Sequence, residues 1–251
     1  MRFDVVTLFP EIFAPFLTIG VTRRAFESKA VEVRLWNLRD FAQGNYRRVD
    51  DRPFGGGPGM VMMVEPLVQA VQAIKAQRQD RAPVVLFSPI GQTLNHAAVE
   101  RWSGSQGAVL ICGRYEGVDQ RFIDTYVDQQ ISLGDFVLSG GEVAAMALLD
   151  AVARLQPGVL NDEGSHQLDS FNPALDGLLD CPHYTRPENW EGATVPPVLL
   201  SGHHQQIERW RRDRRLQLTA RHRPDLVERA RSAGQLSPQD EAVLSAFRST
   251  L

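Results

Sequence analysis

Short apolar runs alternate with amphipathic stretches through the first 155 residues. Strands are predicted where β-branched, aliphatic or aromatic residues run together and stop at glycine, proline or a polar turn, at residues 3–8, 31–36, 83–88, 109–112 and 127–133. Helices are predicted where apolar residues recur every three or four positions, at residues 13–28 with a break near Gly20, 65–79, 95–102 and 143–155. Asn95 is the candidate N-cap of the third of these helices. In the second, the residues predicted to face inward are Leu67, Val68, Val71 and Ile74. Strands that alternate with helices predict an α/β fold with a mainly parallel sheet.

Two of these strands end in glycine-rich turns. The run 109–112 stops at Gly113, and the run 127–133 stops at Gly134. The sequence Ser139-Gly140-Gly141-Glu142 has the spacing of a capping box, which predicts Ser139 as the N-cap of the following apolar helix. Strand ends, glycine turns and a helix N-terminus together form the crevice in which α/β sheets bind ligands. Because neither turn has a dinucleotide or phosphate-loop pattern, we expect backbone groups to hold the ligand.

The pattern changes after residue 156. Residues 157–177 contain few apolar residues and many turn formers, which is typical of a mobile linker. Residues from 178 are proline-rich and extended, and helical periodicity returns from His203, with a last helix starting at Ser237-Pro238. We therefore predict a first domain at 1–160, a linker at 161–177 and a small all-helical second domain at 178–251.

Charge is distributed unevenly along the chain. The net charge is −3, but residues 201–251 carry ten Arg and no Lys against six acidic residues. A run of arginines often marks only a solvated helix face. The density of arginine at 209–215 around Trp210, in a small terminal domain, favours a surface that binds phosphates. The excess of Arg over Lys suits bidentate phosphate recognition but fits a GC-rich genome equally well.

Several protein classes are excluded by what the sequence lacks. Its two cysteines, Cys112 and Cys181, are too few for a disulfide framework, and no C-x-x-C or zinc-ligand spacing occurs. We interpret Cys181-Pro-His183 as packing the linker rather than binding metal. The apolar runs are too short to span a membrane, and the N-terminus does not resemble a signal peptide. We therefore expect a cytoplasmic protein.

A polar, glycine-rich loop occupies residues 47–60. Gly55, Gly57 and Gly59 fit the G-x-G-x-G of Rossmann-type methyltransferases, but no apolar strand precedes them. Two interpretations remain open from the residues alone. The segment is either a surface loop or a loop whose bare backbone approaches a flat ligand such as a nucleobase.

Six segments together resemble the bacterial tRNA (guanine-N1)-methyltransferase family, TrmD, of the SPOUT class. They are F-G-G-G-P-G-M (54–60), S-P-x-G-Q (88–92), G-R-Y-E-G-V-D (113–119), S-L-G-D-F-V-L-S-G-G-E (132–142), L-L-D-C-P-H-Y-T-R-P (178–187) and V-P-P-V-L-L-S-G-x-H (195–204). The resemblance covers nearly the whole chain. It implies methylation of N1 of guanosine at position 37 of tRNA, 3′ of the anticodon. It also implies a deep trefoil knot, where alternation alone would predict an unknotted doubly wound sheet.

The resemblance further implies S-adenosylmethionine as cofactor, bound by the turns after Ser88, Cys112 and Leu133. The implied contacts are Ser88, Pro89, Gly91, Gly113, Tyr115, Glu116, Gly117, Ser132, Leu133, Gly134, Asp135, Phe136, Val137, Leu138, Gly140 and Gly141. Two positions depart from the family pattern. Phe136 stands where the family often has Tyr, which removes a hydroxyl group. Ile90 stands where many relatives have another residue, so no side-chain contact is assigned there.

Transfer to N1 requires a proton acceptor and a cation near the guanine oxygen. The resemblance implies Asp169 as the base, Arg154 as the cation, and Glu116 beside the cofactor, with Mg²⁺ dependence near Glu116 and Asp169. From residues alone, Asp169 is a solvated linker carboxylate and Arg154 complements a helix dipole. Since a free Asp has a pKa of about 3.9, we expect an environment that raises the pKa of Asp169 or lowers that of the substrate. The implied substrate contacts are Asp50, Pro58, Gly59, Arg154, Asp169, Arg209, Arg212 and Arg215.

The family builds each active site from two subunits, which implies a homodimer, and the apolar helix 143–155 is a candidate part of its interface. Three alternatives remain. The protein could be a SPOUT enzyme with another RNA target, against which the G-G-G-P-G loop and the D-S-F linker argue. It could be a non-catalytic RNA-binding protein. A nucleotide-phosphate enzyme is disfavoured because the phosphate loop is missing.

Overall fold

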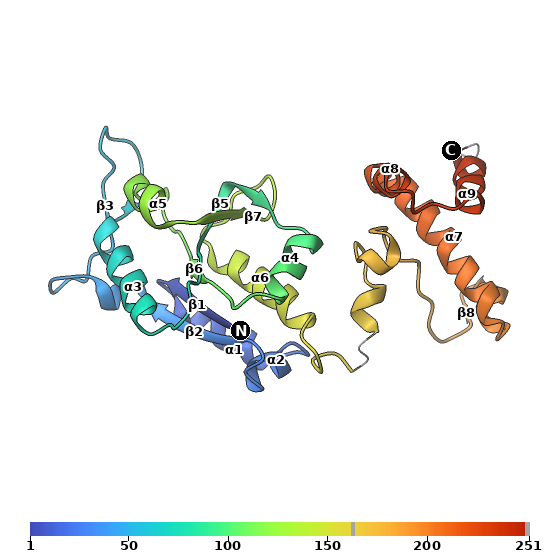
Figure 1. Cartoon of the computed structure of the whole chain (residues 1–251). Coiled ribbons are helices and arrows are strands. Elements are labelled where there is room, and N and C mark those ends of the chain that lie inside the picture. The colour runs from blue at the N-terminus through green and yellow to red at the C-terminus, as the bar shows by residue number, and fades with distance from the viewer. Residues whose placement is uncertain (162–163, 249–251) are drawn as a thin grey trace. The chain divides into compact units, whose positions relative to one another are not determined.

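The computed structural model describes residues 1–161 and 164–248, and the chain divides into two compact units, 1–161 and 162–251 (Figure 1). Residues 162–163 of the predicted linker and 249–251 of the predicted second domain lie outside the described residues. A five-stranded sheet organises the first unit, with β1 (Arg2–Thr7), β2 (Glu32–Asn37), β5 (Val84–Thr93), β6 (Val109–Ile111) and β7 (Gln129–Ser132). The strand order is β2-β1-β6-β5-β7 and every pairing is parallel. This confirms the predicted α/β class.

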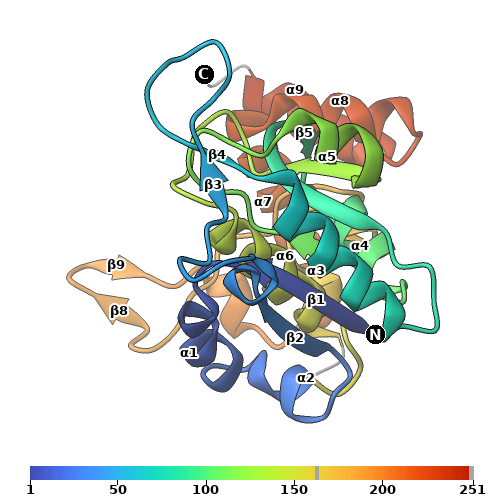
Figure 2. The ribbon, with the colours of Figure 1, turned by 90° about the vertical axis from the view of Figure 1, so that its left-hand side faces the viewer.

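Helices cover both faces of the sheet (Figures 1 and 2). One face is covered by α1 (Phe13–Thr18), α2 (Arg23–Glu27), α4 (His96–Ser103) and α6 (Glu142–Arg154), and the other by α3 (Val64–Ala76), α5 (Gln120–Tyr126) and the 3₁₀ helix η2 (Leu38–Phe41). Strand β1 shows how the two layers form, because successive side chains point to opposite faces. Phe3 and Val5 pack in the layer of Leu148, whereas Val6 packs in the layer of Leu67. Each such buried side chain contributes ~2 kcal/mol to folding.

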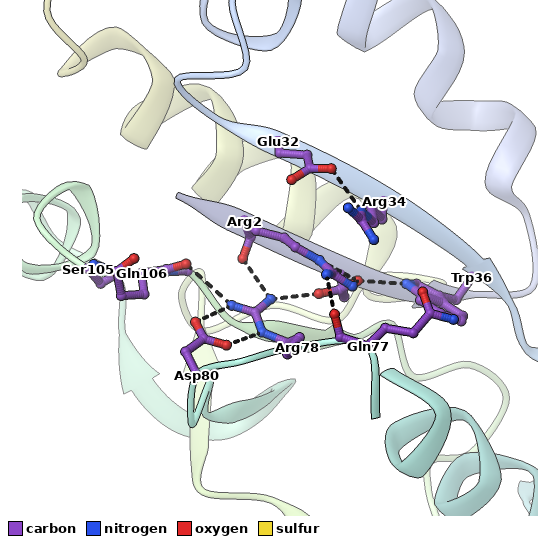
Figure 3. A network of polar contacts seen from close by, with 11 residues as sticks. Arg2, Glu32, Arg34, Trp36, Gln77, Arg78, Asp80, Ser105 and Gln106 are labelled. Carbon is purple, nitrogen blue, oxygen red and sulfur yellow. Dashed lines mark hydrogen bonds and ion pairs between the residues drawn. The ribbon is translucent and has the colours of Figure 1, made fainter. Parts of the chain in front are cut away.

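A buried carboxylate interrupts the apolar alternation of β1. Asp4 is fully buried, and its Oδ1 accepts hydrogen bonds from Arg2 Nη2 at 2.7 Å and Trp36 Nε1 at 2.8 Å. Its Oδ2 pairs with Arg78 Nη1 at 2.6 Å, and Arg78 also binds Asp80 (Figure 3). A buried charge is tolerated only when it is paired and hydrogen-bonded. The network joins β1, β2 and the segment after α3.

Several local predictions are confirmed. Helix α4 has Asn95 as its N-cap, with the side-chain oxygen accepting from Ala98 N at 3.0 Å. The predicted break near Gly20 separates α1 from α2, and Gly20 has a φ of +80°. In α3 the predicted inward residues are buried, apart from Val68, which is half-buried.

The predicted capping box is wrong. Helix α6 begins at Glu142, its N-cap is Gly141, and no side chain caps it. The reason is a β-bridge between Arg114 and Gly140, which keeps the chain extended past Ser139. Glu142 is therefore the first helical residue and is buried instead of turning back toward Ser139.

Strand β5 is longer than predicted. It continues through residues 88–92, which the pattern predicts as a turn, and its pairing with β7 shifts in register between Phe87 and Gln92. Gly91 allows this continuation, because a Cβ there would overlap the backbone of Gln130 and Ile131. The predicted turn is thus an irregularity within a strand, in which residues 88–91 have no register partner in β7.

The remaining elements of the first unit are short. They are the 3₁₀ helix η1 (Pro10–Ile12) and the two-stranded β3 (Asp50–Asp51) and β4 (Val61–Met62).

The second unit contains η3 (Ser165–Leu168), η4 (Pro173–Leu175), the hairpin β8 (Asn189–Trp190) and β9 (Ala193–Thr194), η5 (Pro197–Leu200), α7 (His204–His222), α8 (Pro224–Ser232) and α9 (Pro238–Arg248). Its small apolar core consists of Leu178, Leu216, Val227, Ala230 and Leu244. Among the described residues, no helix is both long enough and apolar enough to cross a lipid bilayer.

Candidate active site

Three chain segments enclose one cavity of about 390 Å³ at the carboxyl-terminal side of the sheet. The segments are residues 86–90 of β5, the bend 113–118 after β6, and residues 130–141 at and after β7, with additional lining from Gln120, Ile123 and Ala144. This is the position where parallel sheets bind ligands, because strand ends leave a crevice there.

Most of the predicted cofactor contacts line this cavity. They are Ser88, Pro89, Gly113, Tyr115, Glu116, Gly117, Ser132, Leu133, Phe136, Val137, Leu138, Gly140 and Gly141. Gly91, Gly134 and Asp135 are not among the lining residues. Ile90, to which no contact was assigned, does line the cavity. The cavity therefore gathers the three predicted turns, and cofactor binding by each residue stays a prediction.

Two adjacent glycines allow the bends to approach each other. A Cβ on Gly141 would lie 2.7 Å from the Cα of Cys112, and a Cβ on Gly140 would overlap the side chain of Arg114. The Gly141 N–H donates to the carbonyl oxygen of Gly113 at 3.0 Å. Any larger residue at 141 must move the strand end that forms the cavity wall.

A buried ion pair, which the sequence analysis missed, joins the same bends. Arg114 Nη2 lies 2.9 Å from Glu142 Oε2, and Thr7 donates a hydrogen bond of 2.8 Å to Glu142 Oε1. Arg114 also donates to the Ser139 carbonyl oxygen at 3.1 Å and stacks over the ring of Phe9. Because the Glu142 side chain is only 1% exposed, its charge depends on this cation. The cavity wall is thereby held from three parts of the chain.

Cys112 lies directly behind this wall and is fully buried. Burial raises the pKa of its thiol well above the usual value, and the negative charge of Glu142 adds to the effect. A thiol that stays protonated is a poor nucleophile. We therefore assign Cys112 a packing role.

The glycine-rich loop is tied to the bend 113–117. Glu116 N donates to the Met60 carbonyl oxygen, and Met62 N donates to the Gly117 carbonyl oxygen, both at 2.9 Å. Gly59 lies against the Glu116 side chain, where a Cβ would collide. The loop base is thus fixed beside the cavity. Phe54, at the start of the glycine run, is 99% exposed.

Asp50 and Pro58, the other predicted contacts near this loop, lie in different surroundings. Pro58 is exposed. Asp50 is half-buried in β3 and interacts electrostatically with Tyr115. Tyr115 belongs to the bend 113–118 and has a φ of +61°. Partial burial raises the pKa of the Tyr115 phenol, and the negative charge of Asp50 raises it further. Tyr115 therefore stays a neutral hydroxyl at physiological pH.

The two other predicted catalytic residues do not line the cavity. Arg154 is half-buried in the last turn of α6, in the first unit. Asp169 is the C-cap of η3, in the second unit, and its N–H donates to the His166 carbonyl oxygen at 3.3 Å. The cavity thus belongs to the first unit and Asp169 to the second.

The predicted phosphate contacts in α7 all form ion pairs. Arg209 pairs with Asp213 and, at 3.0 Å, with Asp240. Arg212 lies 2.6 Å from Asp176 and 3.2 Å from Asp240, and Arg215, which is buried, lies 3.3 Å from Asp180. These arginines hold the linker segment and α9 against α7.

One group of metal-ligand atoms occurs among the described residues, where Asp180, Cys181 and His183 place theirs within 4.8 Å of one another. The Asp180 carboxylate is already bound by the Cys181 N–H at 2.7 Å, by His183 at 2.8 Å and by Arg215. Burial raises the pKa of the Cys181 thiol, and Asp180 adds to this effect. These hydrogen bonds and ion pairs within the unit explain why the three residues lie together.

Comparison with known proteins agrees with this geometry. Residues 1–229 match the profile of the family described as tRNA (Guanine-1)-methyltransferase TrmD. The chain belongs to this family. A TrmD relative from Polaromonas sp. strain JS666 is 74% identical over 249 residues, covering 98% of this chain and 96% of the relative. Another from Albidiferax ferrireducens is 76% identical over 245 residues, covering 98% and 99%. Both are named tRNA (guanine-N(1)-)-methyltransferase.

The TrmD match includes every predicted site residue. It contains the three bends around the cavity, the glycine-rich loop, Asp169 and all of α7. A relative from Bordetella parapertussis is still 57% identical over 249 residues, covering 98% of this chain. The resemblance stated from the sequence motifs is confirmed.

Proposed function

We propose that the chain transfers a methyl group from S-adenosylmethionine to N1 of guanosine 37 of tRNA. The observation that carries the proposal is the meeting of three glycine-bounded bends around one cavity in a chain of the TrmD family. The test is incubation of protein, tRNA transcript and S-adenosylmethionine, followed by nucleoside analysis. We expect 1-methylguanosine with wild-type tRNA and none after a guanosine-to-adenosine change at position 37. Methylation of both transcripts would assign a different target base.

The cavity residues fit S-adenosylmethionine in size and chemistry. A cavity of about 390 Å³ lies within the roughly 300–1,000 Å³ of small-molecule sites. The side chains of Leu133, Phe136 and Leu138 supply apolar surface for a purine ring, and backbone groups of Gly113, Gly140 and neighbouring residues supply polar contacts. The cofactor would provide an electrophilic methyl group on a sulfonium.

The chain's own residues would supply the acid–base chemistry. Asp169 would accept the N1 proton of guanine, which gives N1 the electron pair that bonds to the methyl group, while the carbon–sulfur bond of the sulfonium would break and leave its electron pair on sulfur as a neutral thioether. Arg154 would stabilise the negative charge that develops on the guanine oxygen. Glu116, a carboxylate at the cavity edge, together with Asp50 and Gly59, would orient the base beside the cofactor.

Replacement of Asp169 tests the assigned base. Asp169→Asn keeps the shape but cannot accept the proton, so we expect turnover to fall by at least about 100-fold while tRNA affinity stays within about twofold. Single-turnover methylation and filter binding measure the two quantities. Arg154→Ala should likewise lower turnover strongly and leave the melting temperature nearly unchanged. Turnover close to wild type in Asp169→Asn would remove Asp169 from this role.

We also propose that the active site is shared between two copies of the chain, which the TrmD family membership supports. Val143, at the start of α6, is 52% exposed and offers apolar surface for such an interface. The units would divide the work into cofactor binding by 1–160 and tRNA binding by 178–251.

Mixed dimers test this sharing. Gly141→Ala should disable the cavity and Asp169→Asn the base. In a dimer with shared sites, equal mixing of the two inactive variants restores about a quarter of wild-type activity, because half the dimers are mixed and each has one intact site. If each site forms within one chain, the mixture stays inactive.

Three further properties complete the proposal. The parallel order β2-β1-β6-β5-β7 is compatible with a trefoil knot, which would shorten the fully stretched chain in a single-molecule pulling experiment. Mg²⁺ commonly uses one or two carboxylates with substrate oxygens and water, so Glu116 and Asp169 fit a metal requirement that removal by a chelator would reveal. The proposed location is the cytoplasm, where fractionation should find the protein with tRNA.

A further inference from the structure

The arginines of α7 fall into two classes by their partners. Arg209, Arg211, Arg212 and Arg215 each pair with a carboxylate. Arg214 donates instead to the neutral Gln217 amide oxygen at 2.7 Å, and neither Arg214 nor Arg221 has a carboxylate within ion-pair distance in the described part of the chain. Two cations of α7 therefore remain uncompensated.

These two cations lie on one face of the helix. Trp210, Arg214, Gln217 and Arg221 are spaced by four, three and four residues, which places them along one stripe. The buried residues Arg215, Leu216 and Thr219 lie on the opposite side. Arg214 and Arg221 are exposed, while Trp210 and Gln217 are half-buried. We call these four residues the α7 stripe.

An aromatic pair forms one end of the α7 stripe. The Trp210 and Tyr184 rings lie 6.2 Å apart at an interplanar angle of 59°, and the Arg214 guanidinium lies 5.5 Å from the Trp210 ring centre. Tyr184 is 49% exposed. A tryptophan on the solvent side of a helix is not required by the core, which lies on the other side.

We infer that the α7 stripe, with Tyr184, binds an unpaired segment of the tRNA. Unpaired bases stack on aromatic rings and on arginine planes, whereas duplex RNA is recognised mainly through its backbone and shape. Arg214 and Arg221 complement the phosphates, since no carboxylate of the described chain neutralises them. Arg209, Arg212 and Arg215 are paired within the unit, and their contact with RNA stays a separate prediction. The inference rests on the proposed function and assigns one RNA-binding surface within it.

Binding of a labelled tRNA transcript to the full-length protein, followed by fluorescence anisotropy, tests the surface. Trp210→Leu should weaken binding about tenfold and Trp210→Phe less than about twofold, because the second variant keeps a ring. Arg214→Gln and Arg221→Gln should each weaken binding about fivefold and reduce the slope of log K against log salt by about 0.7. A single-stranded RNA oligonucleotide should compete better than a duplex of equal length.

Arg211→Gln is the matched control, because it removes the same charge from the same helix but from an arginine paired with Glu208 at 2.6 Å. We expect its affinity within about twofold of wild type. Equal weakening in the control, or wild-type affinity in the stripe variants, overturns the inference. Melting curves of every variant exclude loss of folding as the cause.

Kinetics separate this inference from the proposed function. The stripe variants should raise KM for tRNA and leave the affinity for S-adenosylmethionine unchanged. If the wild-type protein methylates tRNA but the variants keep its KM, the surface is wrong and the function stands. If the wild-type protein forms no 1-methylguanosine yet the variants lose tRNA binding, the function is wrong and the surface stands.

Discussion

Around the cavity and along helix α7, segments that are far apart in the sequence are held together by different kinds of contact. Around the cavity, segments far apart in the sequence are joined mainly by backbone groups, such as Gly141 N–H to Gly113, and by the absence of side chains at Gly140 and Gly141. In α7, distant segments are joined by side-chain charges, such as Arg212 to Asp176 and Asp240. The first arrangement should be sensitive to added volume, and the second to lost charge and to pH.

The largest expected effect comes from adding one methyl group at the cavity. Gly141→Ala places a Cβ 2.7 Å from the Cα of Cys112, and we expect the affinity for S-adenosylmethionine to fall roughly 100-fold. The matched control is Gly104→Ala, where the nearest atom would be 3.9 Å away. Isothermal titration measures both. Tolerance of the Gly141 variant would show that shape does not control this region.

Loss of one charge in α7 should have the next largest effect. Arg212→Met leaves the buried Asp240 with Arg209 as its remaining cation, and we expect a loss of about 2.5 kcal/mol in the free energy of unfolding. Arg211→Met breaks an exposed pair and should cost less than about 0.5 kcal/mol. Urea unfolding followed by circular dichroism compares the two. Equal costs would contradict the assignment of a structural role to Arg212.

The pH dependence of the second unit should be smaller. Burial alone would raise the pKa of Asp240, but hydrogen bonds from Arg212 and Ser237 lower it to about 2. A lowered carboxyl pKa stabilises the folded state above the unfolded value near 4, and this stability is lost as pH falls from about 4 to about 2. The full loss, complete below pH 2, should be roughly 2 kcal/mol, and about half of it should appear between pH 7 and pH 3, measured by urea unfolding at pH 7, 4 and 3. Asp240→Asn should flatten this part of the profile, and an unchanged slope would exclude Asp240.

The smallest expected effect is that of salt on the cavity. Because most of its lining residues are uncharged, the affinity for S-adenosylmethionine should change less than about twofold between 0.05 and 0.3 M salt. Binding of tRNA should weaken steeply over the same range. Parallel titrations compare the two ligands, and a steep response of the cofactor would place charged contacts at the centre of its site.

Local features of the fold follow from the sequence because they depend on neighbouring residues. The Asn95 cap, the break at Gly20 and the apolar face of α3 each follow from spacing within one element. The β5 extension does not, because it depends on the register with β7 and on the closeness of Gly91 to Ile131. The length of β5 is therefore set by its pairing with another strand and not by its own sequence pattern.

The candidate site likewise combines features that the sequence predicts with contacts that it does not. Its glycine-bounded bends are visible as motifs, but the contact of Arg114 with Glu142 crosses 28 positions and no spacing rule predicts it. A pattern also cannot separate Arg212 from Arg214, since the acids that pair with Arg212 are Asp176, at the C-cap of η4, and Asp240 in α9. Density of charge was predictable, and its neutralisation was not.

The two cysteines make each unit separately measurable. Cys112 and Cys181 are both buried, with no disulfide, and one lies in each unit. An alkylating reagent can reach either sulfur only when its surroundings open, so labelling rates report two opening free energies from one sample. Mass spectrometry of the two labelled peptides would thus measure separately the local opening of the cavity wall around Cys112 and of the helical unit around Cys181.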